Sequence, residues 1–234
     1  MASEQAAQII AAQKVVRIGD IAPDFDQEST KGPVNWHNFT KDSWSILFSH
    51  PKAKTPICTT ELAALAARFK DFEALGVKVA AVAVDSVEDN AAWVPDIAKL
   101  AKTDDVPFPI LCDKDYKIAK LYGMVNQEHI DGAGMPLTVR SVFFIQPDRK
   151  VGAIITYNAN VGRNIDEIFR VIDSLQIAYE GMKNGTPVAC PVNWSKGGRI
   201  VVPPFVPTEK AQEDYKNLEI VQPYLRYADA PVPK

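Results

Sequence analysis

Cys58 has the sequence surroundings of a reactive thiol. It follows Thr55 and Pro56, which read as the N-cap and first position of a helix. Apolar residues then continue from the cysteine at steps of four, three, four and three, namely Leu62, Leu65, Phe69 and Phe72. Cys58 would therefore lie in the first helical turn, where unpaired amide hydrogens and the helix dipole favour the nucleophilic thiolate. The alternative, a small buried hydrophobic residue, does not account for the polar residues around it.

Arg140 and His50 are the other candidates for chemistry at this thiol. Arg140 opens an apolar strand, stays charged at any physiological pH, and can donate hydrogen bonds to a sulfur. A surface ion pair is the alternative for this arginine. His50 ends a predicted strand before the Cys58 helix, where a lone histidine is more often structural than chemical.

Composition excludes several functional classes. The chain has 234 residues and a net charge of -3, which gives no sign of nucleic-acid binding. Three separate cysteines are too few for a disulfide framework and fit a reducing compartment. The three histidines do not cluster with cysteines, so we expect no metal site and no cofactor. No apolar stretch is long enough for a membrane span, and residues 1–13 lack the features of a signal peptide, so the sequence predicts a cytoplasmic protein.

Strands and helices alternate along most of the chain, which predicts an α/β fold with a mixed central sheet. We expect residues 1–16 to be a loose segment, residues 17–184 to form the main domain, and residues 185–234 to form an extended, Pro-rich C-terminal region. The expected strands are 44–48, 78–84, 107–111, 139–145 and 151–157, the last two as an antiparallel pair. One expected helix begins at Pro56 and carries Cys58 in its first turn. The others cover 87–102, 115–121 and 165–175, and Pro95 is expected to kink or divide the helix 87–102.

The spacing Pro51-x-x-x-Thr55-x-x-Cys58 resembles the active-site motif of the peroxiredoxins, and the longer string 49–61 resembles their one-cysteine subgroup. Other family-like segments follow in the expected order: 19–25, 107–110, 140–145, 162–164 and 224–227. The resemblance covers roughly residues 17–229.

This resemblance implies a thioredoxin-like fold and a thiol-dependent peroxidase that reduces hydrogen peroxide and alkyl hydroperoxides. The intermediate would be a sulfenic acid on Cys58. It implies that Thr55 and Arg140 act with the cysteine and that Pro51 shapes and shields the pocket. Two further residues, Glu61 and Arg163, resemble a supporting ion pair behind the site. A histidine at the position of His50 is expected near the sulfur.

The resemblance also implies a homodimer through the C-terminal region and a thiol reductant such as glutathione or thioredoxin. Cys190 lies in a segment, 188–194, that resembles the resolving-cysteine segment of two-cysteine peroxiredoxins. The run 186–188 resembles the one-cysteine form, which lacks that cysteine. Cys190 thus departs from the one-cysteine pattern, and its two-cysteine-like segment makes it a candidate resolving residue. Cys112 follows a short apolar run and is expected to be a structural thiol.

Two alternatives remain beside the peroxidase. Some one-cysteine relatives also have phospholipase activity, and the positions matching their catalytic residues are Ser43, His37 and Asp148. The serine lacks the glycines of a G-x-S-x-G elbow, because Lys41 and Ser45 replace them. The other alternative is a redox-sensing, chaperone-like thioredoxin-fold protein, which would not need Thr55, Cys58 and Arg140 together.

Overall fold

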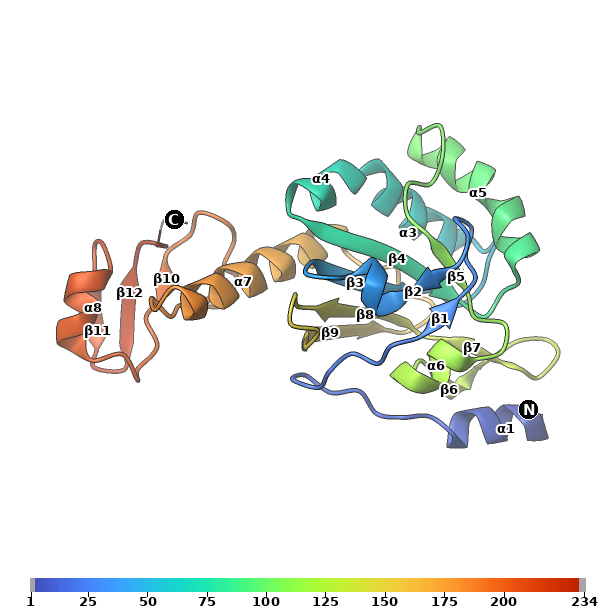
Figure 1. Cartoon of the computed structure of the whole chain (residues 1–234), viewed down its shortest axis with the longest axis horizontal. Helices are drawn as coiled ribbons and strands as arrows, with labels where there is room; N and C mark the ends of the chain where they lie inside the picture. Colours follow the sequence, from blue (N-terminus) through green and yellow to red (C-terminus); the bar gives the residue numbers. More distant parts are fainter. Residues whose placement is uncertain (1–2, 232–234) are drawn as a thin grey trace. The chain divides into compact units, whose positions relative to one another are not determined.

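The computed structural model describes residues 3–231, which form two compact units, one up to Arg163 and one from Asn164 onward. The second unit begins with helix α7 (Ile165–Lys183), whereas the sequence places the boundary after residue 184 (Figure 1). Composition changes only at the Pro-rich stretch, but Ile177 of α7 already packs on the apolar cluster of the second unit. Packing and composition therefore mark different boundaries.

The first unit is built on a five-stranded mixed sheet with the order β5-β4-β3-β8-β9. Strands β3 (Trp44–Ser49), β4 (Val77–Ala83) and β5 (Ile110–Cys112) run parallel, while β8 (Arg140–Ile145) is antiparallel to both β3 and β9 (Val151–Tyr157). Central strands β3 and β8 are buried along their whole length, as their apolar runs predict. The α/β fold with a mixed sheet is confirmed.

Helices cover the sheet on two sides. Figure 1 shows α3 (Pro56–Ala67), α4 (Phe69–Ala74) and α5 (Val87–Ala101) on one side and α6 (Lys117–Tyr122) on the other. Pro95 lies inside α5 without dividing it. The apolar pattern that starts at Cys58 is instead divided at Arg68, between α3 and α4.

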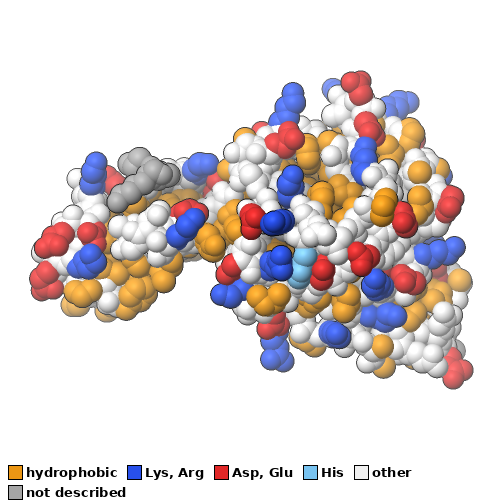
Figure 2. All heavy atoms as spheres, viewed as in Figure 1, with side chains coloured by type: hydrophobic (Ala, Val, Ile, Leu, Met, Phe, Trp, Pro, Cys, Tyr) orange, Lys and Arg blue, Asp and Glu red, His pale blue; other side chains and the backbone are white. Residues whose placement is uncertain are grey.

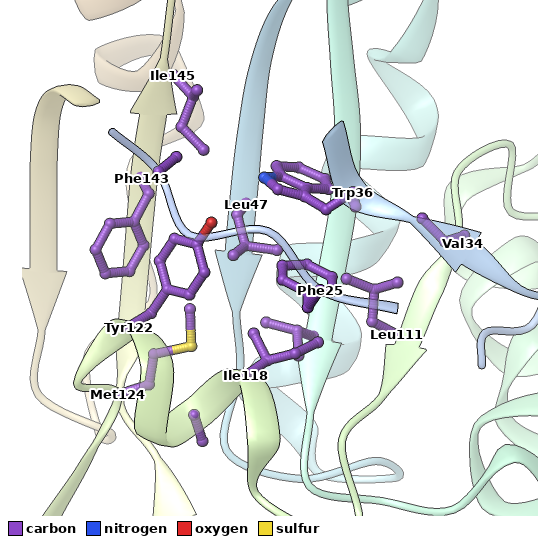
Figure 3. Packing of buried hydrophobic residues seen from close by; sticks show 14 of the residues in the cluster. Phe25, Val34, Trp36, Leu47, Leu111, Ile118, Tyr122, Met124, Phe143 and Ile145 are labelled. Carbon is purple, nitrogen blue, oxygen red and sulfur yellow. The ribbon is translucent and has the colours of Figure 1, made fainter. Parts of the chain in front are cut away.

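One apolar cluster fixes α6 and the N-terminal segment to the sheet. Phe25 and Trp36 stack with ring centroids 5.5 Å apart, and Tyr122 meets Phe143 edge-on at 5.1 Å (Figure 3). The Tyr122 hydroxyl donates to the carbonyl of Pro23 at 2.7 Å. The face of the sheet opposite the Cys58 helix is thus densely packed.

Several short elements escape sequence prediction. Residues 4–11 form helix α1 (Glu4–Ala11), within the segment expected to be loose, because Ser3 caps it and Ile9 and Ile10 pack on the core. A hairpin forms from β6 (Val125–Ile130) and β7 (Pro136–Thr138). Strands β1 (Asp26–Gln27) and β2 (Val34–Asn35) pair and lead into α2 (Trp36–Phe39).

The second unit has its own small core. After α7, strands β10 (Ile200–Val201), β12 (Leu225–Ala228) and β11 (Glu219–Gln222) form an antiparallel sheet, joined by helix α8 (Thr208–Asp214). Trp194 and Tyr215 belong to the apolar cluster under these elements. The Pro-rich region is therefore folded rather than simply extended. Across residues 3–231, none of the helices has the length and apolar character that a membrane crossing needs.

Candidate active site

Cys58 lies at the start of α3, which follows the buried strand β3 after the turn 50–55. It is the third residue of the helix and is fully buried, at 0% exposure. Thr55 occupies the N-cap position and Pro56 the first helical position, as the sequence predicts. However, the Thr55 side chain does not cap the helix, because its Oγ1 donates to the Lys52 carbonyl at 2.9 Å. The first-turn amides therefore remain available to a negative charge at the sulfur.

The turn before α3 is held by neighbouring elements. Lys54 adopts a left-handed backbone conformation with φ of 56°, and the amide of Ala53 donates to Asp85 Oδ2 at 2.7 Å. Pro51 is buried at the start of this turn. The position of the first helical turn is thus set by contacts to the loop after β4 as well as by β3.

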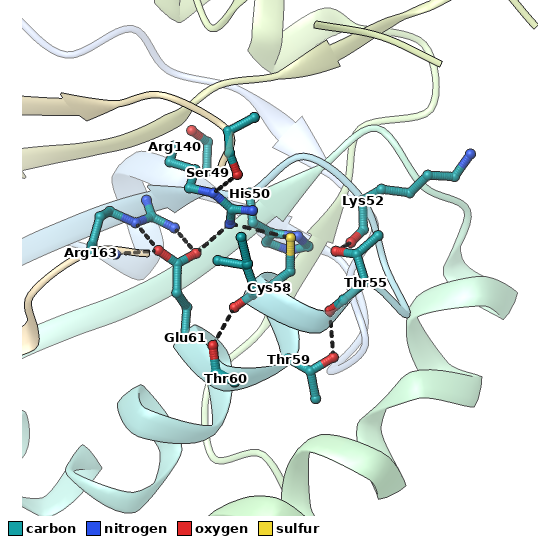
Figure 4. Close-up of polar contacts among 12 residues, drawn as sticks. Ser49, His50, Lys52, Thr55, Cys58, Thr59, Thr60, Glu61, Arg140 and Arg163 are labelled. Atoms are coloured by element: carbon teal, nitrogen blue, oxygen red, sulfur yellow. Dashed lines mark hydrogen bonds and ion pairs between the residues drawn. The ribbon is translucent and has the colours of Figure 1, made fainter. Parts of the chain in front are cut away.

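Arg140, the first residue of β8, brings a positive charge to the sulfur of Cys58. Its Nη1 donates to Cys58 Sγ at 3.4 Å and to Glu61 Oε2 at 2.7 Å, and its Nε donates to the carbonyl of Ala159 at 2.7 Å (Figure 4). The arginine is only 3% exposed, so it is not a surface ion pair. Fixed at both ends, the guanidinium holds one donor against the sulfur.

Glu61 is shared by Arg140 and a second buried arginine, Arg163. Arg163 Nε and Nη2 donate to Glu61 Oε1 and Oε2 at 2.9 and 2.8 Å, and the Arg163 backbone amide donates to Oε1 at 2.8 Å. Burial alone would raise the pKa of Glu61, but hydrogen bonding to Arg163 and the charges of both arginines outweigh it and lower this pKa. The predicted Glu61–Arg163 pair is present and includes Arg140.

Arg163 is further fixed on its other faces. Its guanidinium lies over the Phe48 ring at 3.2 Å from the centroid, and its Nη1 donates to the Ser141 carbonyl at 2.9 Å. Burial lowers the pKa of Arg163 to about 10, so the side chain stays charged at neutral pH. Glu61 is thus an ionised carboxylate between two charged arginines.

His50 is fully buried, yet neither ring nitrogen has a hydrogen-bond partner among the described residues. The expected hydrogen bond from this histidine to the sulfur is therefore absent from the described contacts. Its backbone is fixed instead: the amide donates to Val82 at 3.0 Å and the carbonyl accepts from Thr138 Oγ1 at 2.6 Å. Burial, followed by the charges of Arg163 and Arg140, lowers the pKa of His50 from 6.5 to about 3. The ring is neutral at physiological pH.

We expect this buried neutral histidine to make the protein less stable in acid. Between pH 6.5 and about 3, His50 is protonated in the unfolded chain but stays neutral in the folded protein. The free energy of unfolding therefore falls as the pH falls through this window. In urea titrations at several pH values, His50→Leu should show a shallower dependence, by up to about 1.4 kcal/mol per pH unit. Equal slopes for the two proteins would contradict the neutral assignment.

The other two cysteines have different surroundings. Cys112 is buried, donates to the Ile110 carbonyl at 3.4 Å and accepts from Asn90 Nδ2 at 3.4 Å, and burial raises its thiol pKa. Cys190 lies in the second unit, is partly exposed, and donates weakly to the Ser174 carbonyl at 3.7 Å. Burial also raises the pKa of Cys190. Among the described contacts, neither thiol is bonded to a buried arginine as Cys58 is.

The three residues of the hydrolase alternative each contact a different partner. Ser43 Oγ donates to the Lys41 carbonyl at 3.2 Å, His37 Nε2 contacts the Ala22 carbonyl at 2.8 Å, and Asp148 pairs with Lys150 at 3.2 Å. These contacts are not those of a serine–histidine–carboxylate relay, in which the histidine bridges the other two.

Sequence reasoning misses several residues around the site. Trp93 of α5 lies 5.3 Å from the His50 ring and donates through Nε1 to Thr59 Oγ1 at 3.1 Å. Ser49 accepts from the amide of Ser141 at 3.0 Å and joins β3 to β8. Ala159 takes part through its carbonyl. A backbone oxygen leaves no trace in the residue types, and Trp93 fits equally well as an ordinary core residue.

Comparisons with known proteins identify the family of this chain. The AhpC/TSA family model matches residues 18–154. Peroxiredoxin-6 of Rattus norvegicus is 44% identical, over 92% of this chain and 97% of the relative. The crystal structure of a peroxiredoxin 6 mutant from Arenicola marina has a TM-score of 0.87 at 39% identity, covering 92% of this chain and 99% of that one. A yeast mitochondrial 1-Cys peroxiredoxin has a TM-score of 0.83 at 39% identity, with the same coverage.

The chain therefore belongs to the AhpC/TSA family, the peroxiredoxins, and is a thiol-dependent peroxidase. Within this family its similarity is to the one-cysteine subgroup. The thioredoxin-like fold predicted from the sequence is confirmed by these structural neighbours.

Proposed function

We propose that Cys58 is the residue that attacks the peroxide. Its thiolate sulfur attacks one oxygen of the O–O bond, an S–O bond forms as the O–O bond breaks, and the leaving oxygen takes up a proton as water or an alcohol. The product at the enzyme is a Cys58 sulfenic acid. The observation that carries this assignment is the 3.4 Å contact from Arg140 Nη1 to Cys58 Sγ inside a buried cluster.

Neighbouring residues divide the remaining work. Arg140 stabilises the thiolate and the charge that develops on the leaving oxygen. Thr55, three residues before Cys58, orients the peroxide, and the buried Pro51 shields the sulfur from water. Glu61 and Arg163 hold Arg140 in position. His50 is neutral, so it acts as an uncharged buried side chain and donates no proton to the reaction.

Trapping the oxidised sulfur tests the assignment. The protein is treated with one equivalent of hydrogen peroxide and then with a sulfenic-acid reagent, and the labelled residue is located by peptide mass spectrometry. We expect the label at Cys58 in the wild type and in Cys112→Ser, and no label in Cys58→Ser. A label on Cys112, or a wild type with neither the label nor a disulfide at Cys58, would contradict the proposal.

We also propose a homodimer that is reduced by an external thiol. Figure 2 shows hydrophobic side chains gathered on the C-terminal unit. Among the described residues of that unit, the large exposed apolar side chains are Met182, Val192, Phe205, Ile220, Val221 and Tyr224. Such exposure supports a partner surface there. In the yeast mitochondrial 1-Cys peroxiredoxin the thiol-resolving mechanism operates via glutathione and thioredoxin systems, which supports a reductant of this chemistry.

Cys190 is our candidate for a second sulfur in the cycle. It is partly exposed, whereas Cys58 and Cys112 are buried, so it is the most accessible of the three thiols. We expect peroxide-treated protein to run on a non-reducing gel as a disulfide-linked dimer that Cys190→Ser abolishes. Cys112→Ser is the matched control and should still form the dimer. A monomeric band with a lasting Cys58 sulfenic acid would show that Cys190 takes no part and that the strict one-cysteine mechanism applies.

Neither alternative function is needed to account for the site. The residues of the hydrolase alternative are not arranged as a relay, and the buried Cys58–Arg140–Glu61 cluster serves no evident purpose in a binding module. A cytoplasmic location stays a prediction of the sequence. Because the yeast neighbour is mitochondrial, cell fractionation is the measurement that checks it.

A further inference from the structure

The loop 158–162 carries the carbonyl that fixes one end of Arg140. It follows β9 and is mostly exposed, with only Ala159 half-buried. Arg140 Nε donates to the Ala159 carbonyl at 2.7 Å. An exposed loop is a poor support for a buried catalytic group unless another element holds it.

His129 of the β6–β7 hairpin supplies that support. The Ala159 amide donates to His129 Nε2 at 3.2 Å, so the two polar groups of this residue face His129 and Arg140. The other contacts of the loop amides near Ala159 stay inside the loop: Asn160 and Val161 both donate to Asn158. The Ala159–His129 bond therefore ties the first half of the loop to a different part of the fold.

The bonding pattern also defines the tautomer of His129. Nε2 accepts from the Ala159 amide, so the ring proton lies on Nδ1, which donates to Asn126 Oδ1 at 2.8 Å. That oxygen also accepts from the amides of Glu128 and His129 at 2.9 and 3.0 Å, which identifies it as the oxygen of the amide. The ring is thus held in the one orientation that offers an acceptor to Ala159.

We propose that His129 is a positioning residue for the peroxidase reaction and acts on Arg140 through the Ala159 peptide. The inference rests on the proposed role of Arg140. His129 fixes the loop, the loop carbonyl fixes Arg140 Nε, and Arg140 Nη1 then points at the sulfur of Cys58. Without the acceptor on His129, the loop and the guanidinium gain freedom, and the donor spends less time against the sulfur.

Two substitutions of similar size separate this role from simple packing. Glutamine reaches as far as Nε2 and offers an amide oxygen to Ala159, whereas leucine fills the space and offers nothing. We expect His129→Leu to slow sulfenic acid formation about five-fold, the factor that corresponds to one ordinary hydrogen bond of ~1 kcal/mol. His129→Gln should stay close to the wild-type rate. The exposed neighbour Glu128→Ala is the matched control and should not differ from the wild type.

A double-mutant cycle with Arg140→Ala decides whether the effect passes through the arginine. Rates of Cys58 oxidation are measured by stopped flow in single turnovers, with thermal unfolding of each variant as a check on folding. We expect His129→Leu to have no further effect when Arg140 is already alanine. An equal five-fold loss in that background, or equal rates for the leucine and glutamine variants, would overturn the proposal. Arg140→Ala alone tests the role of the arginine, so failure of the two ideas is distinguishable.

Discussion

Replacing Cys58 with serine should abolish peroxide turnover. A serine hydroxyl is not ionised at neutral pH and does not attack an O–O bond, so the contact with Arg140 has no thiolate to stabilise. The change is nearly isosteric at a fully buried position, and the fold should be kept. Consumption of hydrogen peroxide and of an alkyl hydroperoxide, each with a thiol reductant, measures the effect.

Cys112→Ser is the matched control for this result. Cys112 is also buried, but its partners are the Ile110 carbonyl and Asn90 rather than an arginine. The variant should keep most of the activity. Loss of activity in Cys112→Ser with an unchanged thermal unfolding curve would show that the wrong sulfur has been assigned.

Replacing Arg140 with alanine should slow the reaction with peroxide by about 100- to 1,000-fold, the loss typical of removing a donor aimed at developing charge. Arg140 is the residue whose guanidinium contacts Cys58 Sγ, so both the thiolate and the leaving oxygen lose their positive partner. Glu61 keeps its bonds to Arg163, so the substitution does not leave a bare buried carboxylate. Stopped-flow measurement of Cys58 oxidation checks the rate.

The Arg140→Lys variant separates the effect of the positive charge from the effect of the guanidinium geometry. It keeps a positive charge but lacks the planar fork that reaches Ala159, Glu61 and the sulfur together. Arg140→Lys should therefore fall between the wild type and Arg140→Ala. A near-normal rate for the alanine variant would remove Arg140 from the mechanism.

The sequence predicts those parts of the site that depend on local pattern. The apolar spacing after Cys58 gives the helix, Pro56 its first position, and the apolar run after Arg140 the strand that carries the arginine. Each of these is set by residues close in the chain. The mixed central sheet follows in the same way from the order of strands and helices.

Other features of the site depend on which of several possible hydrogen-bond partners a side chain takes, and the sequence does not determine this choice. The Thr55 hydroxyl bonds the Lys52 carbonyl instead of capping α3, although both roles suit a threonine at this position. The support of Arg140 by Ala159 joins a strand to an exposed loop through a backbone oxygen, so no residue type marks it. The helix α1 forms because Ile9 and Ile10 find the core, a contact that only the folded chain provides.

The complete burial of Cys58 separates the two halves of the catalytic cycle in time. A small peroxide needs little room, whereas a reducing sulfur on another molecule or another segment needs the first turn of α3 to open. Glu61, one turn further on, is bonded to Arg140 and Arg163, so we expect the opening to be confined to the first turn of α3. While the turn stays closed, we expect the proposed Cys58 sulfenic acid to meet a second peroxide rather than a thiol, and oxidation to sulfinic acid would then stop turnover. At a fixed reductant concentration, we therefore expect the peroxide concentration that inactivates the protein to depend on how often this helical turn opens.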